Sequence, residues 1–131
     1  MKPMQIGEAA VQSGVSAKMI RYYEGIGLIP RSARRPQGYR DYDDEDVHRL
    51  RFVARARDLG FSIKDIAELL RLYSDRRRSS ADVKRIALRH VAELDTKIRM
   101  MRQLKRTIQQ LADRCHGDER PGCPILEDLA G

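Results

Sequence analysis

The segment that begins at Ser79 constrains the fold most, because it contains neither glycine nor proline until Gly117. This stretch predicts one long helix with Ser79 or Ser80 as its N-cap, extending roughly 45 Å at about 1.5 Å per residue. Apolar residues recur along it at steps of three and four, namely Ala87, Val91, Leu94, Ile98, Met101, Leu104, Ile108 and Leu111. The spacing places them on one face of the helix, which we call the apolar stripe.

The apolar stripe requires a partner surface of its own length. In a chain of 131 residues no other segment is long enough to cover it. We therefore expect the long helix to pack against its own copy in a homodimer, and the alternative is a helix folded back onto its own head domain. Only 5% of the residues are aromatic and 34% are charged, so aliphatic side chains packed between helices must supply the core. This composition favours a mainly all-α fold.

Two short helices joined by a glycine turn are predicted near the N-terminus. The first covers residues 6–12 and ends at Ser13-Gly14, where Gly14 suits the left-handed backbone of a helix end. The second covers residues 17–24, with Ser16 as its N-cap. Helix, tight turn and capped helix are the order of a helix-turn-helix, whose second helix enters the DNA major groove.

A small wing and two further helices are expected next. Glycine and proline at residues 25–30 end the second helix, and an extended segment around residues 39–42 is expected to pair with Leu28-Ile29. Asp43 is the expected N-cap of a helix over residues 44–59, which Gly60 ends. Ser62, with Asp65 three residues later, is expected to open a helix to about Tyr73. We expect residues 1–75 to form the head with its helical connector, residues 80–114 the dimerisation helix, and residues 115–131 a loop and short terminal helix.

The charge balance favours an anionic partner. The formal net charge is +7, and cationic side chains that neutralise phosphates release counterions and so drive association with nucleic acid. A second explanation is that the charge only keeps the chain soluble. Lys18, Arg21 and Tyr22 lie within about one turn of the second helix, while Ile20 and Tyr23 are expected to face inward. The wing would add three residues to the same side of the head, Arg35, Tyr39 and Arg40.

Other classes of protein fit the sequence poorly. No motif marks a nucleophile with a base and an orienting partner, so we do not expect an enzyme. The chain opens without a charged segment followed by an apolar one, and no run of about eighteen apolar residues occurs. We therefore expect a cytoplasmic protein that has no membrane partner.

Several ordered motifs resemble the head of the MerR family of transcriptional regulators. They are Ile20-Arg21-Tyr22-Tyr23-Glu24, then Gly27-Leu28-Ile29, then Gly38-Tyr39-Arg40, and finally the string from Arg57 to Ile63. The resemblance implies that the family's DNA-contacting positions are occupied here by Lys18, Arg21, Tyr22, Tyr39, Arg40 and Arg57. It also implies a homodimer with antiparallel long helices, bound to a double-stranded promoter that RNA polymerase uses.

Two cysteines lie just beyond the long helix. Cys115 and Cys123 are separated by seven residues that include two glycines and a proline, so the loop can bring both sulfurs together. Two thiolates without a third soft ligand suit a linear monovalent ion such as Cu(I), whereas Zn²⁺ requires about four ligands. His116, Asp118 and Glu119 could complete a set of four. His116 adjoins Cys115, but in so polar a loop its side chain is expected to face solvent, with a role as a ligand the lesser alternative. A reversible thiol switch is the competing interpretation, and a disulfide formed outside the cell or a small oxidoreductase fits less well.

The same loop resembles that of the CueR-like branch of the family, which senses copper, silver or gold. Cys115, Cys123 and the following Pro124-Ile125-Leu126 carry this resemblance. Ser80 stands where the branch that senses divalent ions has a cysteine, so a divalent-metal sensor is the alternative that Ser80 disfavours. With antiparallel helices, Ser80 and Lys84 of one subunit would meet the cysteine loop of the other. The resemblance implies a regulator that Cu(I), Ag(I) or Au(I) turns into an activator of metal efflux and detoxification genes through DNA distortion.

Overall fold

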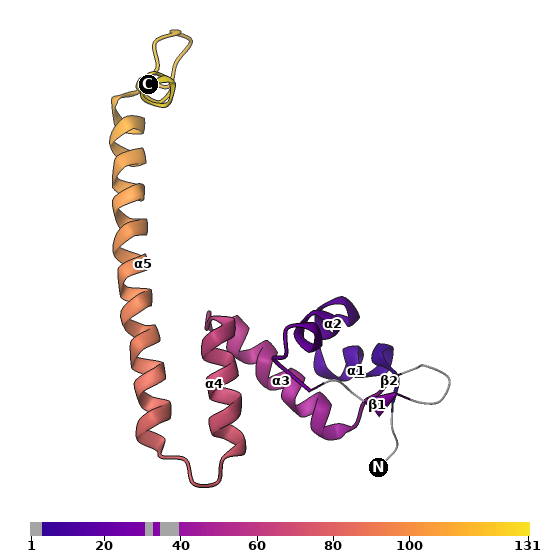
Figure 1. Cartoon of the computed structure of the whole chain (residues 1–131). Coiled ribbons are helices and arrows are strands. Elements are labelled where there is room, and N and C mark those ends of the chain that lie inside the picture. Colours follow the sequence, from indigo (N-terminus) through magenta and orange to yellow (C-terminus); the bar gives the residue numbers. More distant parts are fainter. Residues whose placement is uncertain (1–3, 31–32, 35–39) are drawn as a thin grey trace. The chain divides into compact units, whose positions relative to one another are not determined.

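The computed structural model describes residues 4–30, 33–34 and 40–131, and these residues form six helices and one two-stranded sheet (Figure 1). The expectation of a mainly all-α fold is confirmed. In chain order the elements are α1 (Ile6–Ser13), α2 (Ala17–Gly25), β1 (Ala33–Arg34), β2 (Arg40–Asp41), α3 (Asp44–Asp58), α4 (Ile63–Ser74), α5 (Ser80–Arg114) and α6 (Pro124–Ala130).

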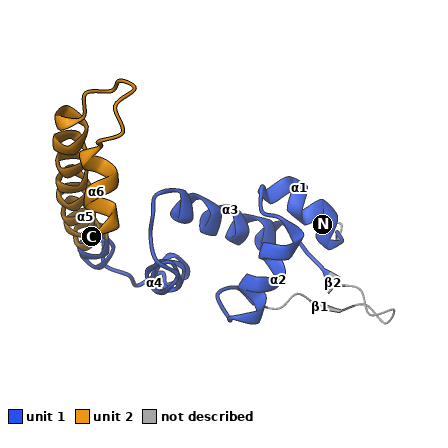
Figure 2. Ribbon diagram, turned by 90° about the horizontal axis from the view of Figure 1, so that it is seen from above, with its two compact units in different colours: residues 1–86 blue, residues 87–131 orange. Residues whose placement is uncertain are grey.

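The chain divides into two compact units, residues 1–86 and residues 87–131 (Figure 2). The first unit contains α1 to α4, the hairpin and the first turns of α5. The second contains the rest of α5, the loop after it and α6. Among the described helices none is long and apolar enough to cross a membrane.

The predicted helix-turn-helix is present. Helix α1 ends where Gly14 adopts a positive φ of 75°, and the Gly14 N–H donates to the carbonyl of Ala10 at 2.9 Å. Glycine tolerates this backbone geometry because it has no Cβ. Helix α2 then begins after Ser16, whose hydroxyl accepts from the Met19 N–H at 3.2 Å. The two local signals read from the sequence are therefore the ones that end α1 and start α2.

The hairpin differs from the expected wing pairing. Strand β2 pairs antiparallel with β1, with Ala33 opposite Asp41, and not with Leu28-Ile29 as predicted. Leu28 and Ile29 are instead buried in the core, 8% and 5% exposed, and their N–H groups donate to the carbonyl of Tyr23. Two apolar side chains that must be buried at the end of α2 cannot also form an exposed strand. Of the residues expected on the wing, Arg35 and Tyr39 lie outside the described residues.

Helices α3 and α4 complete the first unit. Asp43 forms a capping box with Asp46, since the Asp43 carboxylate accepts from the Asp46 N–H at 2.8 Å and Asp46 accepts from the Asp43 N–H at 3.1 Å. Ser62 caps α4 by accepting from the Asp65 N–H at 3.1 Å. Helix α3 packs against both α1 and α4. The largest fully buried side chains of this unit are Tyr42, Ile20, Leu50, Ile66, Ile86 and Val53.

Helix α5 is the long helix predicted from the sequence, and it has 35 residues. Ser79 is its cap, because the Ser79 hydroxyl accepts from the Ala81 N–H at 3.1 Å and Ser80 is already helical. Six of the eight residues of the apolar stripe are exposed in the described chain, from 37% at Leu94 to 69% at Met101, whereas Ala87 and Leu111 are half-buried. A continuous apolar surface of this length on one helix marks an interaction surface.

Candidate DNA-reading face and metal-binding loop

Helix α2 presents the three side chains singled out from the sequence on its exposed face. Lys18 and Arg21 are exposed, and Tyr22 is 50% exposed. Ile20 and Tyr23 are 0% and 5% exposed, which confirms the prediction that they face inward. The buried pair anchors the helix, so the face with two cations and a phenol is left to donate hydrogen bonds to phosphates or base edges.

A buried hydrogen bond connects α2 to the residues after the hairpin. The Tyr42 hydroxyl donates to Oε1 of Glu24 at 2.7 Å, and both side chains are buried. The backbone of Tyr42 also pairs with that of Met4, with N···O distances of 2.8 and 2.7 Å. Sequence reasoning missed this pair, because the two residues are 18 positions apart and no local pattern indicates that a glutamate in a helix is buried. Their contact couples the orientation of α2 to the end of β2.

Arg51 makes a second long-range contact within the head. Its Nε and Nη2 atoms donate to the Gln12 carbonyl at 2.9 and 2.8 Å, across 39 residues of sequence. Carbonyls in the last turn of a helix lack a partner inside the helix, so Arg51 satisfies one of them and ties α3 to α1. No local sequence signal indicates this contact.

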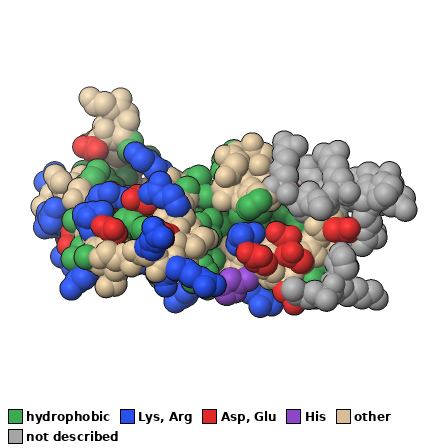
Figure 3. Space-filling view, turned by 60° about the horizontal axis from the view of Figure 1, so that its bottom comes forward, with side chains coloured by type: hydrophobic (Ala, Val, Ile, Leu, Met, Phe, Trp, Pro, Cys, Tyr) green, Lys and Arg blue, Asp and Glu red, His purple; other side chains and the backbone are tan. Residues whose placement is uncertain are grey.

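The remaining residues proposed to contact DNA lie outside α2. Arg40 lies in β2, and Arg57 is exposed in the last turn of α3. On the face drawn in Figure 3, Lys and Arg side chains are numerous, and acidic side chains lie both among them and in one larger group. Such a distribution leaves cationic surface available to a polyanion.

The loop after α5 brings the two cysteine sulfurs together. Cys115 and Cys123 are both half-buried, and their Sγ atoms are 3.9 Å apart. Within the loop Gly117 has a φ of 69°, a backbone geometry that favours glycine. Arg120 donates to the Asp118 carboxylate through its side chain at 2.8 Å and through its backbone N–H at 2.9 Å. The loop therefore folds back as the sequence predicted.

The start of α6 affects the chemistry of Cys123, the residue directly before it. The backbone N–H of Leu126 lowers the pKa of the Cys123 thiol most, and partial burial acts in the opposite direction. The N–H of Ile125 and the Cys115 thiol lower this pKa further, and the net direction is downward from the usual value. Since the thiolate is the form that binds metals, this environment favours metal binding.

The two sulfurs have no third protein donor beside them among the described residues. No group of three or more His, Cys, Asp or Glu side chains is placed there to hold a metal ion. His116 is exposed, and the Arg120 side chain holds the pKa of the Asp118 carboxyl below its usual range. Because the Asp118 carboxylate already accepts hydrogen bonds from Arg120, it is a poor candidate for a metal ligand. The donor set of the described loop is therefore two thiols, which fits a soft ion of low coordination number better than Zn²⁺.

Ser80 and Lys84 lie in the first turns of α5, and both are exposed. Asp82, between them, pairs with Arg85 at 3.0 Å. The amino end of a helix adds a partial positive charge near these residues. Together they form a cationic end of α5 that suits an anionic neighbour.

Comparisons with known proteins match nearly the whole chain. A family model described as "MerR HTH family regulatory protein" matches residues 4–73, and one described as "MerR, DNA binding" matches residues 47–111. The "Heavy metal-dependent transcription regulator 2" of Rhizobium meliloti (strain 1021) is 59% identical over 127 residues, which cover 97% of this chain and 86% of that protein.

A further curated relative and a solved structure also match nearly the whole chain. The "HTH-type transcriptional regulator CueR" of Escherichia coli O6:H1 is 38% identical and covers 98% of this chain and 95% of its own length. The crystal structure of the regulator PbrR691 from Ralstonia metallidurans CH34, in complex with lead(II), aligns with a TM-score of 0.83 at 30% identity, over 96% of this chain and 98% of that one.

Proposed function

The chain belongs to the MerR family of DNA-binding transcription regulators, a family of regulators and not of enzymes, and from this premise we propose that it is a cytoplasmic homodimer that activates transcription when it binds a monovalent soft metal ion. The proposed ion is Cu(I). Ag(I) and Au(I) are the alternatives, because they are soft monovalent ions that two thiolates also bind. The regulated genes are those of metal efflux and detoxification. The second candidate is a divalent-metal sensor of the same fold.

The observation that carries this proposal is the 3.9 Å separation of the Cys115 and Cys123 sulfurs in the loop after α5. A metal–sulfur bond of about 2.3 Å places two sulfurs about 3.8 Å apart at a tetrahedral angle and about 4.6 Å apart in a line. The observed separation of 3.9 Å is near the tetrahedral value, and a linear site would require the two sulfurs to move apart by about 0.7 Å. The pair can therefore close on one ion with a small movement of the loop, and the distance by itself does not select the coordination geometry. The number of donors then selects among ions, and the described loop offers two.

The choice of a monovalent ion has further support in Ser80. A cysteine at this position would add a third thiolate from the start of α5, and the chain has a serine there. The divalent candidate is favoured by the lead(II) complex of the structural relative at 30% identity. It would require donors beyond the two thiols, from water or from another part of the dimer.

The charge of the site explains why it would be completed by a second subunit. Two thiolates with one monovalent ion carry a net negative charge, which is costly to bury without a positive group nearby. In one chain about 45 Å of helix, at roughly 1.5 Å per residue, separates Lys84 from Cys115. An antiparallel partner helix removes this separation. Lys84 of the partner subunit and the amino end of that α5 would then lie against the thiolates.

The head supplies the DNA contacts in this proposal. Lys18, Arg21 and Tyr22 on α2 would reach base edges and phosphates of the major groove, while the wing residues Arg35, Tyr39 and Arg40, together with Arg57, would bind the backbone. Two heads on one dimer would contact successive major grooves. Activation requires that the metal-loaded dimer bind a bent and untwisted promoter, which RNA polymerase can transcribe, more tightly than the undistorted promoter. Metal binding must therefore change the difference in binding energy between these two DNA shapes.

The test is an anaerobic titration with buffered Cu(I), followed by operator footprinting and transcription in vitro. Cys115→Ser or Cys123→Ser should abolish the metal response and leave operator affinity nearly unchanged. Arg21→Ala should weaken operator binding and leave Cu(I) binding intact, and Arg106→Ala on the exposed side of α5 is the matched control for loss of one cation. Unchanged DNA shape and transcript level upon Cu(I) binding would refute the activation mechanism.

The same purified protein distinguishes metal sensing from a thiol switch. Native mass spectrometry after anaerobic purification should show one monovalent ion for each loop. A Cys115–Cys123 disulfide that forms and breaks with oxidant, without metal binding in the reduced state, would instead support redox control.

A further inference from the structure

The apolar stripe of α5 has coiled-coil positions that can be assigned along its central part. Val91 and Ile98 occupy a positions, and Leu94 and Met101 occupy d positions, because steps of three and four alternate between them. All four side chains are exposed in the single chain, between 37% and 69%. Residues at e and g flank such a stripe, and their charges decide which partner orientation is favourable.

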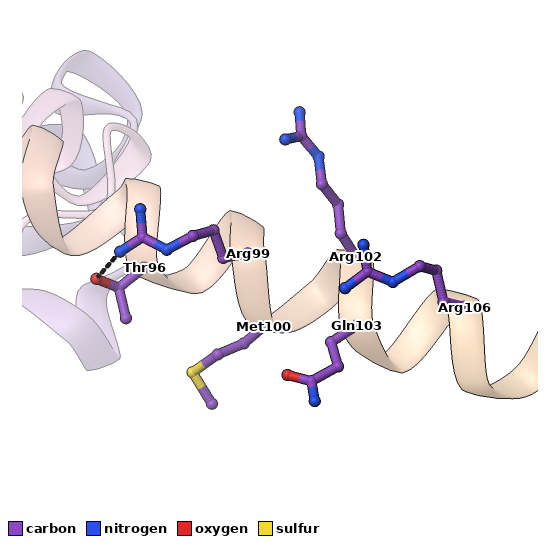
Figure 4. Close-up of a pocket in the computed structure, with 6 residues that line it drawn as sticks. All are labelled: Thr96, Arg99, Met100, Arg102, Gln103 and Arg106. Atoms are coloured by element: carbon purple, nitrogen blue, oxygen red, sulfur yellow. Dashed lines mark hydrogen bonds between the residues drawn. The ribbon is translucent and has the colours of Figure 1, made fainter.

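The two e positions beside this central part carry opposite charges. They are Asp95 and Arg102, and both are exposed. Within the described part of the chain neither makes a hydrogen bond or ion pair. The Arg99 guanidinium turns back to donate to the Thr96 hydroxyl at 3.2 Å, whereas the Arg102 side chain extends away from the helix (Figure 4). The structure therefore shows an unpaired anion and an unpaired cation, two turns apart, on the same edge of the stripe.

An antiparallel pairing of two α5 helices brings these two charges together. In one register in which a positions face d positions, Ile98 packs on Met101 of the partner subunit and Val91 packs on Ile108 of the partner subunit. In this register e positions neighbour e positions, so Asp95 lies beside Arg102 of the partner subunit. The two-fold axis repeats the contact, and the dimer contains it twice.

A parallel pairing gives the opposite electrostatic result. In a parallel dimer each g position neighbours the e position of the next heptad, which would place Lys97 beside Arg102 of the partner subunit. Lys105 follows at the next a position and would face the partner's Lys105. Like charges in these places are destabilising. The charge pattern thus distinguishes the two orientations, although the apolar stripe by itself fits both.

We propose that Asp95 and Arg102 form two reciprocal ion pairs across the dimer, and that these pairs select the antiparallel orientation and the register of α5. The proposal rests on the homodimer of the proposed function and on charge complementarity between two copies of this chain. In the selected register Lys105 lies over the partner's Leu94, where its aliphatic stem can cover apolar surface while its ammonium group reaches solvent.

A charge-reversal cycle on the full-length protein tests the proposal, with the dimer dissociation constant measured by sedimentation equilibrium at low salt. Asp95→Arg and Arg102→Asp should each weaken the dimer by about 10-fold, because each replaces two attractive contacts by two repulsive ones. The double variant restores opposite charges and should return to within about 3-fold of the wild type. Arg106→Asp makes the same charge change on the side away from the stripe and is the matched control.

The direction in which Arg102→Asp changes the dimer dissociation constant best distinguishes the proposed ion pairs from general charge repulsion and from a parallel dimer. This substitution lowers the net positive charge of the helix, so any general repulsion between copies would be relieved and the dimer strengthened, as in the Arg106→Asp control. A parallel dimer would also be strengthened, since Lys97 would gain an anionic neighbour. Strengthening by Arg102→Asp, or no recovery in the double variant, would therefore overturn the proposal.

The same measurements distinguish failure of the homodimer from failure of the ion pairs alone. A wild-type protein that stays monomeric at every concentration would overturn the homodimer on which the proposed function rests. A stable dimer that binds operator but is indifferent to the charge at Asp95 and Arg102 would overturn the ion pairs alone.

Discussion

The hydrogen bond between Tyr42 and Glu24 gives a direct test of how the head is held together. Tyr42→Phe removes only the hydroxyl, which donates to the Glu24 carboxyl at 2.7 Å, in a site where the two side chains are 2% and 3% exposed. Loss of a donor to a buried polar group costs about 1–3 kcal/mol of unfolding free energy, because water does not replace it at low cost. For a chain of this size the loss corresponds to a fall in Tm of about 4–12 °C.

The assay is urea unfolding of the full-length protein at one fixed protein concentration, since dimerisation makes apparent stability concentration-dependent. Tyr22→Phe is the matched control, because it removes the same atom from an exposed tyrosine of α2, and its effect should stay within about 0.5 kcal/mol. Operator affinity of Tyr42→Phe should also fall, since the bond couples α2 to the end of β2. Equal stabilities of the Tyr42→Phe and Tyr22→Phe variants would refute this explanation of the head.

Three further predictions concern the metal site and the caps. Ser80→Cys should extend the transcriptional response to Zn²⁺ or Cd²⁺, measured by competition titration with a reporter promoter, and an unchanged ion preference would contradict the assigned role of Ser80. Affinity for Cu(I) should fall as pH falls, because protons compete for the thiolates; since the pKa of Cys123 is lowered from its usual value, the Cys123 thiolate should stay available to a lower pH than that of an ordinary cysteine, and a Cu(I) affinity independent of pH would count against thiolate ligation. Ser62→Ala should cost about 1 kcal/mol of unfolding free energy through loss of the hydrogen bond to the Asp65 N–H, whereas Ser74→Ala at the other end of α4 should cost less; equal effects would show that the cap is unimportant.

Much of the local structure was predictable because its signals lie within a few residues of one another. Gly14 ends α1, Ser16 and Ser62 cap α2 and α4, and the capping serine before α5, with the absence of glycine and proline as far as Gly117, predicts α5 almost to its ends. The wing was predicted wrongly in its pairing, because the same apolar residues, Leu28 and Ile29, could form either a strand or part of the core. Burial of apolar surface decided between the two, and burial depends on the whole unit.

In the candidate metal site too, the local chemistry was predictable from the sequence and the folded geometry was not. The residue types, their order and the glycine-containing loop between Cys115 and Cys123 already indicate a soft-metal site, since thiol chemistry belongs to the side chains themselves. The 3.9 Å approach of the sulfurs and the commitment of Asp118 to Arg120 come from the folded loop. They reduce the possible donors among the described residues to two.

The sequence by itself determined the helices, their caps, the apolar stripe and the chemistry available at each position, because these follow from side chains within a few turns of one another. The tertiary structure alone decided which distant groups meet, such as Tyr42 with Glu24 and Arg51 with the Gln12 carbonyl. Contacts of this kind depend on how the helices pack around a shared core, and packing is a property of the whole unit that no local pattern of residues encodes.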